Sequence, residues 1–148
     1  IVFASVTRAL IICSLSVLIF WLIVDIKVQN FFLLTIYLIL SSIILSCAGI
    51  IAGLWAEKFD HMATITNFLI VPLSFLSGTF YSVDNLPDIL KSISYYNPFF
   101  HMIDGFRYAF ILDMDGSIKF GIVYLLILSF LFWLIAYFLY KKGYKIKS

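Results

Sequence analysis

Long apolar runs separated by short polar segments give this chain its overall pattern. A helix of about 20 apolar residues crosses the roughly 30 Å of hydrocarbon in a bilayer, so each long run predicts a spanning helix. We expect four spans, at about residues 4–24, 31–55, 62–83 and 118–140. The predicted fold class is an all-α polytopic membrane protein in which residues 1–148 form one transmembrane domain.

Prolines, glycines and charges gather in an insert before the last run, at residues 84–112, and in the stretch leading to it. Pro72 lies within the third run and should kink or end its helix. Gly78 follows in a short stretch of small and polar residues, where the helix should be leaving the membrane. The third span is therefore expected to be irregular.

The insert begins with a short amphipathic helix. Asp84 or Asn85 can cap a helix whose first turn holds Pro87. Apolar residues then recur at i, i+3, i+4 and i+7, at Leu86, Ile89, Leu90 and Ile93. The helix is too short to span, so we expect it to lie along the outer membrane interface.

A second helix follows, because Asn97 precedes Pro98 and a residue before proline avoids the helical region. It runs from about Pro98 to Leu112, and the two helices together predict an interfacial or re-entrant hairpin. Asp104 and Arg107 are neighbours at i, i+3, and charges on so apolar a helix are costly unless paired. We expect this ion pair; it could pin the helix, contact substrate or relay protons.

The loop after this helix, Asp113-Met114-Asp115-Gly116, begins like a calcium-binding loop. Such a loop needs a bidentate acid at its twelfth position. That position is Tyr124 here, so we expect a turn and no metal site.

Small residues form a stripe within the second apolar run: Ser42, Ser46, Gly49 and Gly53. At the helical repeat they lie within about 60° of one another. Small residues let helix backbones approach closely. The stripe is therefore either a packing surface within the chain, a face for a second copy, or a wall that faces substrate.

Composition agrees with a lipid environment. The chain is 64% hydrophobic and 12% charged, whereas soluble domains are about 45–50% apolar and about 25% charged. A net charge of +2 is too small to predict nucleic-acid binding. Lysines cluster at the C-terminal end, which the positive-inside rule places in the cytoplasm; four crossings then put both ends of the chain inside and the insert outside.

Motifs for chemistry are absent from the sequence. There is no G-x-x-x-x-G-K-[ST] to cradle ATP phosphates, and no G-x-S-x-G, H-E-x-x-H or C-x-x-C. Cys13 and Cys47 both lie in apolar runs and read as small buried hydrophobes. We therefore expect no catalytic, cofactor or metal site in this chain.

Residues 72–110 carry an ordered set of motifs: Pro72, Phe75-Leu76-Ser77-Gly78, Phe80-Tyr81, Asp84, Leu86-Pro87, Asn97-Pro98, Asp104 and Arg107. As a set they resemble the permease subunits of type-2 ATP-binding-cassette exporters. The form NPFFHMIDGFRYAFI looks most like the bacterial multidrug-type branch. Ile1 is not a start methionine and the chain opens inside an apolar run, so we expect a C-terminal fragment.

The resemblance implies six spans in a complete subunit, two of them before Ile1. It implies a second permease copy, as a homo- or heterodimer, and an ATPase subunit that binds the ATP. The loop with Glu57, Lys58 and Asp60 would be a contact for that ATPase, and the insert would close the outer end of the path. The location implied is the bacterial inner membrane, and the substrate an amphipathic or lipid-like compound.

Other functions stay open on the sequence. An exporter of polysaccharide or glycolipid would use the same scaffold, and a structural membrane subunit would need no path. A membrane enzyme acting on lipid-linked substrates at the outer face would draw its acid and base from Asp84, Asp88, His101 or Asp104. A P-loop ATPase encoded beside this chain would favour the exporter.

Overall fold

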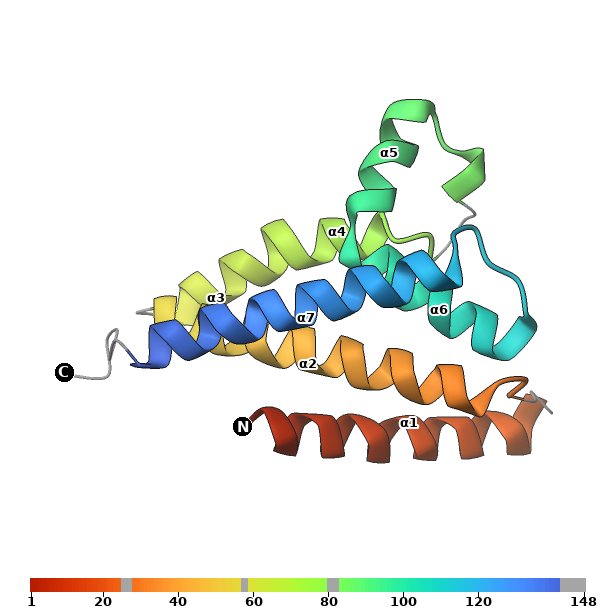
Figure 1. Ribbon diagram of the computed structural model, residues 1–148, viewed down its shortest axis with the longest axis horizontal. Coiled ribbons are helices and arrows are strands. Elements are labelled where there is room, and N and C mark those ends of the chain that lie inside the picture. The colour runs from red at the N-terminus through yellow and green to blue at the C-terminus, as the bar shows by residue number, and fades with distance from the viewer. Residues whose placement is uncertain (25–27, 57–58, 80–82, 142–148) are drawn as a thin grey trace.

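The computed structural model describes residues 1–24, 28–56, 59–79 and 83–141, and the regular elements in these ranges are helices (Figure 1). Three helices are long and apolar enough to cross a membrane: α1 (Val2–Val24), α2 (Phe31–Trp55) and α7 (Ile118–Lys141). Their 23, 25 and 24 residues give roughly 35 Å of helix each. The all-α membrane fold is thus confirmed, with helices at three of the four expected spans.

The third expected span is broken into short pieces. α3 (Phe59–Ile65), a π-turn (Thr66–Ile70) and α4 (Val71–Phe75) follow one another without a gap. Proline cannot donate the usual helical hydrogen bond and crowds the preceding turn, and the wider π-turn stands directly before Pro72. The helical run ends at Phe75, short of residue 83, so a fourth membrane crossing stays a prediction.

The insert holds a 3-10 turn (Val83–Asn85), α5 (Asp88–Tyr96) and α6 (Pro98–Ile111). The expected cap of α5 is wrong. Pro87 itself occupies the N-cap position with an extended backbone, and no side chain caps the helix. Asn85 ends the tight 3-10 turn before the helix begins, whereas the side chain of Asp84 lies outside the described residues.

The boundary at Asn97-Pro98 is confirmed. Asn97 ends α5 with an extended backbone, and its side-chain oxygen accepts a hydrogen bond from Phe99 N at 3.0 Å. One residue therefore stops the first helix and caps the second. α6 ends at Leu112, whose left-handed backbone (φ 55°) turns the chain away.

α2 is the central helix and packs against α1, α3, α6 and α7. Figure 1 shows α1, α2 and α7 running along the length of the molecule, with α6 beside α2 and α7 at one end. α5 runs across that direction. Because the long helices set the direction of the membrane normal, α5 has the orientation of a helix in the membrane plane; its depth stays a prediction.

Tyr37 fills the centre of the molecule, between α2, α6 and α7. Its ring is 1% exposed and its hydroxyl donates to Ile118 O at 3.2 Å. A Cβ built at Gly105 would lie 2.2 Å from the ring, and one at Gly121 would lie 2.9 Å from the hydroxyl oxygen. The two glycines make the room that lets α6 and α7 close around Tyr37.

Apolar side chains cover the outside of this structure. None of the described side chains of α1 is buried, and α5 turns Ile89 and Ile93 outward while it buries Ser94. Such a surface is unstable in water and suits hydrocarbon. Both α1 and α5 therefore present faces that lipid or another polypeptide must cover.

Ile1 and the last turn of α7 lie toward the same end of the molecule, and the insert lies at the other end (Figure 1). This agrees with the expectation that both ends of the chain share one side of the membrane. Which side that is stays a prediction, and Lys142 and the residues after it lie outside the described ranges.

Candidate functional site

Arg107, on α6, joins three segments that are distant in sequence. Its Nη1 lies 3.1 Å from Asp115 Oδ2 in the loop before α7 and 3.7 Å from Asp104 Oδ1. Its Nη2 donates to the carbonyl oxygen of Gly78, in the turn after α4. The expected Asp104–Arg107 ion pair is confirmed, but Asp115 is the closer carboxylate. We call Gly78, Asp104, Arg107, Asp115 and Gly116 the polar hub.

The Asp104 carboxylate binds the backbone of the loop before α7. Its two carboxylate oxygens accept from Asp115 N and Gly116 N, each at 2.9 Å. A Cβ at Gly116 would stand 2.9 Å from Asp104 Oδ2, so this close approach requires glycine. Burial raises the pKa of Asp104 above its ordinary value, while the two N–H groups and Arg107 act in the opposite direction.

Asp115 extends the hub to the start of the insert. Its Oδ2 also accepts from Val83 N at 2.9 Å, and its carbonyl accepts from the Tyr95 hydroxyl at 3.2 Å. The 3-10 turn, α5, α6 and the loop before α7 are therefore held by one short segment. Hydrogen bonds to charged groups are among the stronger ones, at about 1.5–3 kcal/mol each.

Gly78 and Asn97 attach α4 and its following turn to the insert. Gly78 has φ 73°, a left-handed conformation that favours glycine, and this turn presents its carbonyl to Arg107. Asn97 Nδ2 donates to Leu73 O at 2.6 Å. The irregular third segment is thus fixed to the insert at two points through backbone oxygens.

His101 is buried at the junction of α5, α6 and α7. Its Nε2 lies 2.8 Å from Tyr95 O, and its ring contacts Phe120 and Tyr124. Burial lowers the pKa of His101, while the Tyr95 carbonyl and the charge of Asp104 act in the opposite direction. The imidazole is therefore held mainly neutral in the folded protein.

Acidification should test this burial. Because the folded-state pKa of His101 is lowered, the unfolded chain binds its proton first, and stability is lost as the pH falls through about 6.5. We expect the melting temperature of purified protein to fall further between about pH 7.5 and 5.5 in the wild type than in His101→Gln. Equal losses in both proteins would contradict this role, since Asp104 is present in each.

Two of the residues predicted as acid or base of a membrane enzyme, Asp104 and His101, have structural partners here, and the side chain of Asp84 lies outside the described residues. Asp104 and His101 are 2% and 3% exposed, and each is hydrogen-bonded. Asp88 stands in the first turn of α5, where a negative charge suits the helix N-terminus. Asp104 and His101 thus hold parts of the insert together.

The stripe on α2 divides into two parts. Ser42 is half-buried and its hydroxyl donates to Leu38 O, whereas Ser46 Oγ is buried with no partner among the described residues. A Cβ at Gly49 or Gly53 would meet nothing within 4 Å beyond its own helix and chain neighbours. Packing inside the described chain therefore does not explain the two glycines.

A family model described as ABC-2 type transporter matches residues 1–111 of the chain, from α1 to the end of α6. The chain belongs to the ABC-2 type transporter family. The match includes three hub residues, Gly78, Asp104 and Arg107, but it ends before Asp115 and Gly116. The resemblance read from residues 72–110 is thereby confirmed at the level of the family.

The curated relatives of this ABC-2 chain are proteins named inner membrane transport permease YadH. Those of Escherichia coli K12, Escherichia coli O157:H7 and Shigella flexneri are each 32% identical to it over 146 residues. The alignment covers 97% of this chain and 56% of each relative, so the chain spans about half their length. No solved structure matches it.

The loop expected to face the ATPase of an ABC-2 transporter is described only in part. Glu57 and Lys58 lie outside the described residues. Asp60 stands in the first turn of α3, exposed, and the neighbouring His61 ring contacts Trp55 at the end of α2. α3, whose first turn holds Asp60, lies toward the opposite end of the molecule from α6 (Figure 1).

Sequence reasoning missed Asp115, Gly116, Gly105 and Tyr37 as parts of this ABC-2 site. Asp115 and Gly116 were read only as a turn. An acidic residue two positions after Asp113, in a loop facing the chain's second arginine, was a signal for the pairing with Arg107. No local pattern indicates that Tyr37 meets Gly105, since the two are far apart in sequence.

Proposed function

We propose that this chain is part of the membrane subunit of an ATP-driven ABC-2 exporter in the bacterial inner membrane. The observation that carries the proposal is the family match over residues 1–111. The name of the relatives, inner membrane transport permease, supports the location and the role. The apolar helices would form part of a path for an amphipathic or lipid-like substrate.

ATP hydrolysis would come from a partner. The sequence has no G-x-x-x-x-G-K-[ST], so the nucleotide would bind to a separate or fused ATPase. The loop with Glu57, Lys58 and Asp60 is proposed as a smaller contact for that ATPase, because α2, which precedes it, ends away from the insert (Figure 1). A second permease copy, of the same or a different chain, would complete the path.

The insert would act as the outer gate of this transporter. Arg107 joins the turn after α4 and the loop before α7 to α6, and Tyr95 of α5 donates to Asp115 of the same loop. Opening of this gate would require these hydrogen bonds to break together. Pro72, Pro87 and Pro98 would set where the gate bends, because each stands at or beside a helix boundary.

Purification with the ATPase encoded nearest to this chain tests the proposal. We expect a stable complex whose ATP hydrolysis in proteoliposomes is stimulated by amphipathic compounds, with those compounds moved away from the ATPase side. A Walker-A lysine variant of the ATPase should abolish both signals. A protein that joins no ATPase, and that instead alters lipid-linked compounds on its own, would overturn the exporter in favour of the enzyme.

Cysteine labelling should establish the orientation. In a Cys13→Ser/Cys47→Ala background, a cysteine at the exposed Ser92 of α5 should react with a membrane-impermeant maleimide added to intact spheroplasts. A cysteine at Asp60 should react only in inverted vesicles. The reverse pattern would contradict the outward placement of the insert.

A further inference from the structure

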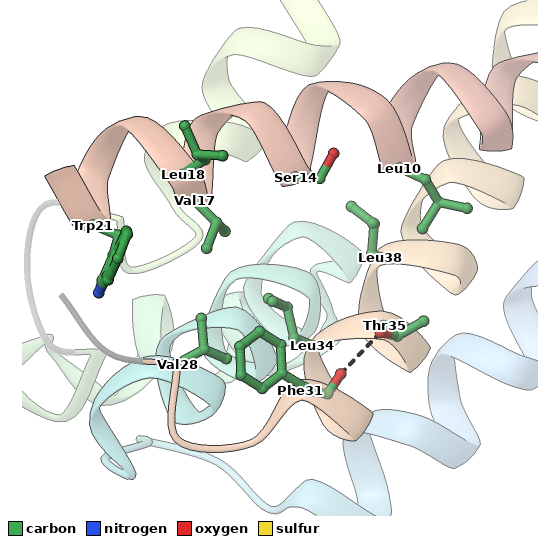
Figure 2. A pocket seen from close by; sticks show the side chains of 10 residues that line it. All are labelled: Leu10, Ser14, Val17, Leu18, Trp21, Val28, Phe31, Leu34, Thr35 and Leu38. Atoms are coloured by element: carbon green, nitrogen blue, oxygen red, sulfur yellow. Dashed lines mark hydrogen bonds between the residues drawn. The ribbon is translucent and has the colours of Figure 1, made fainter.

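A pocket of about 710 Å³ lies between α1 and α2, at the end of the pair where the chain turns from one helix to the other (Figure 2). Its volume falls in the range of roughly 300–1,000 Å³ that ligand pockets have. Figure 2 shows Val17 and Trp21 of α1 directed toward Val28 and the side chains of α2 across the space. The lining residues are Leu10, Ser14, Val17, Leu18, Trp21, Val28, Phe31, Leu34, Thr35 and Leu38.

The two walls are matched faces that do not interlock. The α1 residues recur at helical spacing from Leu10 to Trp21, and those of α2 from Phe31 to Leu38, so each set lies on one face of its helix. Facing helices normally fill such a space with side chains. An unfilled space loses the dispersion contacts of its lining atoms, so something other than these side chains is expected to occupy it.

The chemistry of the lining favours a hydrocarbon occupant. Eight of the ten residues are apolar, and none carries a charge. The two hydroxyls already donate within their own helices, Ser14 Oγ to Ile11 O and Thr35 Oγ1 to Phe31 O, each at 2.8 Å. A charged or strongly polar group would therefore find no compensating partner here.

The pocket is continuous with an exposed apolar surface of α1 and α2. Leu18, Trp21 and Phe31 at its edge are 53%, 58% and 66% exposed. Among the described elements α1 packs against α2 alone, so the space opens sideways between two spanning helices. Hydrocarbon of the bilayer can enter the pocket from that side.

We propose that this pocket holds an acyl chain of a membrane phospholipid as a fixed part of the protein. The acyl chain moves from the hydrocarbon of the bilayer into an equally apolar pocket. Its binding therefore rests on packing against Trp21, Leu34 and the other lining residues rather than on removal of apolar surface from water. The proposal concerns a structural lipid and does not depend on which substrate the transporter moves.

The bound chain would steady the insert as well as α1. Gln29 N and Asn30 N, next to the pocket residue Val28, both donate to Ala109 O of α6, at 2.9 and 3.1 Å. The segment that forms the floor of the pocket is thus the segment that holds the end of α6. A lipid chain between α1 and this floor would limit the movement of both.

A pair of serines on α1 provides a matched test. Ser14 and Ser16 both donate to a carbonyl of their own helix, at 2.8 and 2.9 Å, but only Ser14 lines the pocket. We expect native mass spectrometry of the complete purified chain to find one tightly held phospholipid per copy in the wild type and in Ser16→Phe. Ser14→Phe, which fills the pocket, should lose it.

Photolabelling keeps the test independent of how Ser14→Phe folds. A phosphatidylethanolamine with a diazirine near the end of its acyl chain should label wild-type pocket residues such as Val17 and Leu34 in liposomes. Equal lipid retention in all three proteins would overturn the proposal. So would labelling spread evenly over the outward residues Ile11 and Leu15, a retained compound that is not a phospholipid, or crosslinks showing another protein segment in the pocket.

Discussion

Replacing Arg107 by alanine is expected to undo the polar hub and to abolish transport. The change removes the Arg107–Asp115 ion pair and the hydrogen bond to the carbonyl of Gly78, while Asp104 keeps its two backbone N–H groups. Breaking a buried pair costs about 3–5 kcal/mol. The Arg107 side chain is 22% exposed, so we expect about 2–4 kcal/mol here. Thermal unfolding in detergent, with transport normalised to folded protein, measures both effects.

Three further variants separate the hub from a general loss of charge. Arg8→Ala removes the other arginine, which is exposed on α1, and should leave the melting temperature nearly unchanged. Arg107→Lys should rescue only in part, because an ammonium cannot reach carboxylate and carbonyl with the fork of a guanidinium. The double variant Arg107→Ala/Asp115→Ala should lose less stability than the sum of the losses in the two single variants. Strict additivity of these losses would refute the pairing of Arg107 with Asp115.

Adding one methyl group at Gly105 is expected to be as damaging. The new Cβ of Gly105→Ala would stand 2.2 Å from a ring carbon of Tyr37, which is itself enclosed by three helices. Overpacking of a core costs typically about 1–3 kcal/mol and occasionally more. A contact with a rigid ring should fall at the upper end, and yield and melting temperature should both drop.

The smaller side chain of Tyr37→Val should relieve that clash. Gly105→Ala should therefore cost much less in the Tyr37→Val background than in the wild type, which a double-mutant cycle would show. Gly53→Ala is the matched control, since its Cβ would meet nothing within 4 Å in the described chain, and its stability should not fall. The same penalty in both Tyr37 backgrounds would show that the strain lies elsewhere.

Features set by neighbouring residues could be predicted from the sequence. The boundary at Asn97-Pro98 follows from the backbone restriction before proline, and the Asp104–Arg107 pair follows from their i, i+3 spacing. The long helices α1, α2 and α7 follow from apolar length alone. The predicted cap of α5 is wrong because Asn85 lies in a 3-10 turn before the helix. Capping preferences do not distinguish a residue in such a turn from a residue that caps a helix.

Features set by the tertiary fold could not be predicted. Arg107 has three oxygen partners, and the two nearest, on Asp115 and Gly78, come from other segments. The contact between Gly105 and Tyr37 could not be predicted, since a glycine in an apolar helix is compatible with many kinds of close approach. The hub and the core thus depend on how α2, α6 and α7 assemble, which pattern and spacing do not specify.

The two attachments of α4 have a consequence for how this protein can vary. Arg107 holds Gly78 through a carbonyl oxygen, and Asn97 holds Leu73 in the same way. Every residue carries that oxygen, so a new side chain at position 73 leaves its attachment intact, whereas position 78 is limited by its left-handed backbone angle and its burial. The exposed side chains of α4 can therefore diversify while both attachments to the insert are inherited unchanged.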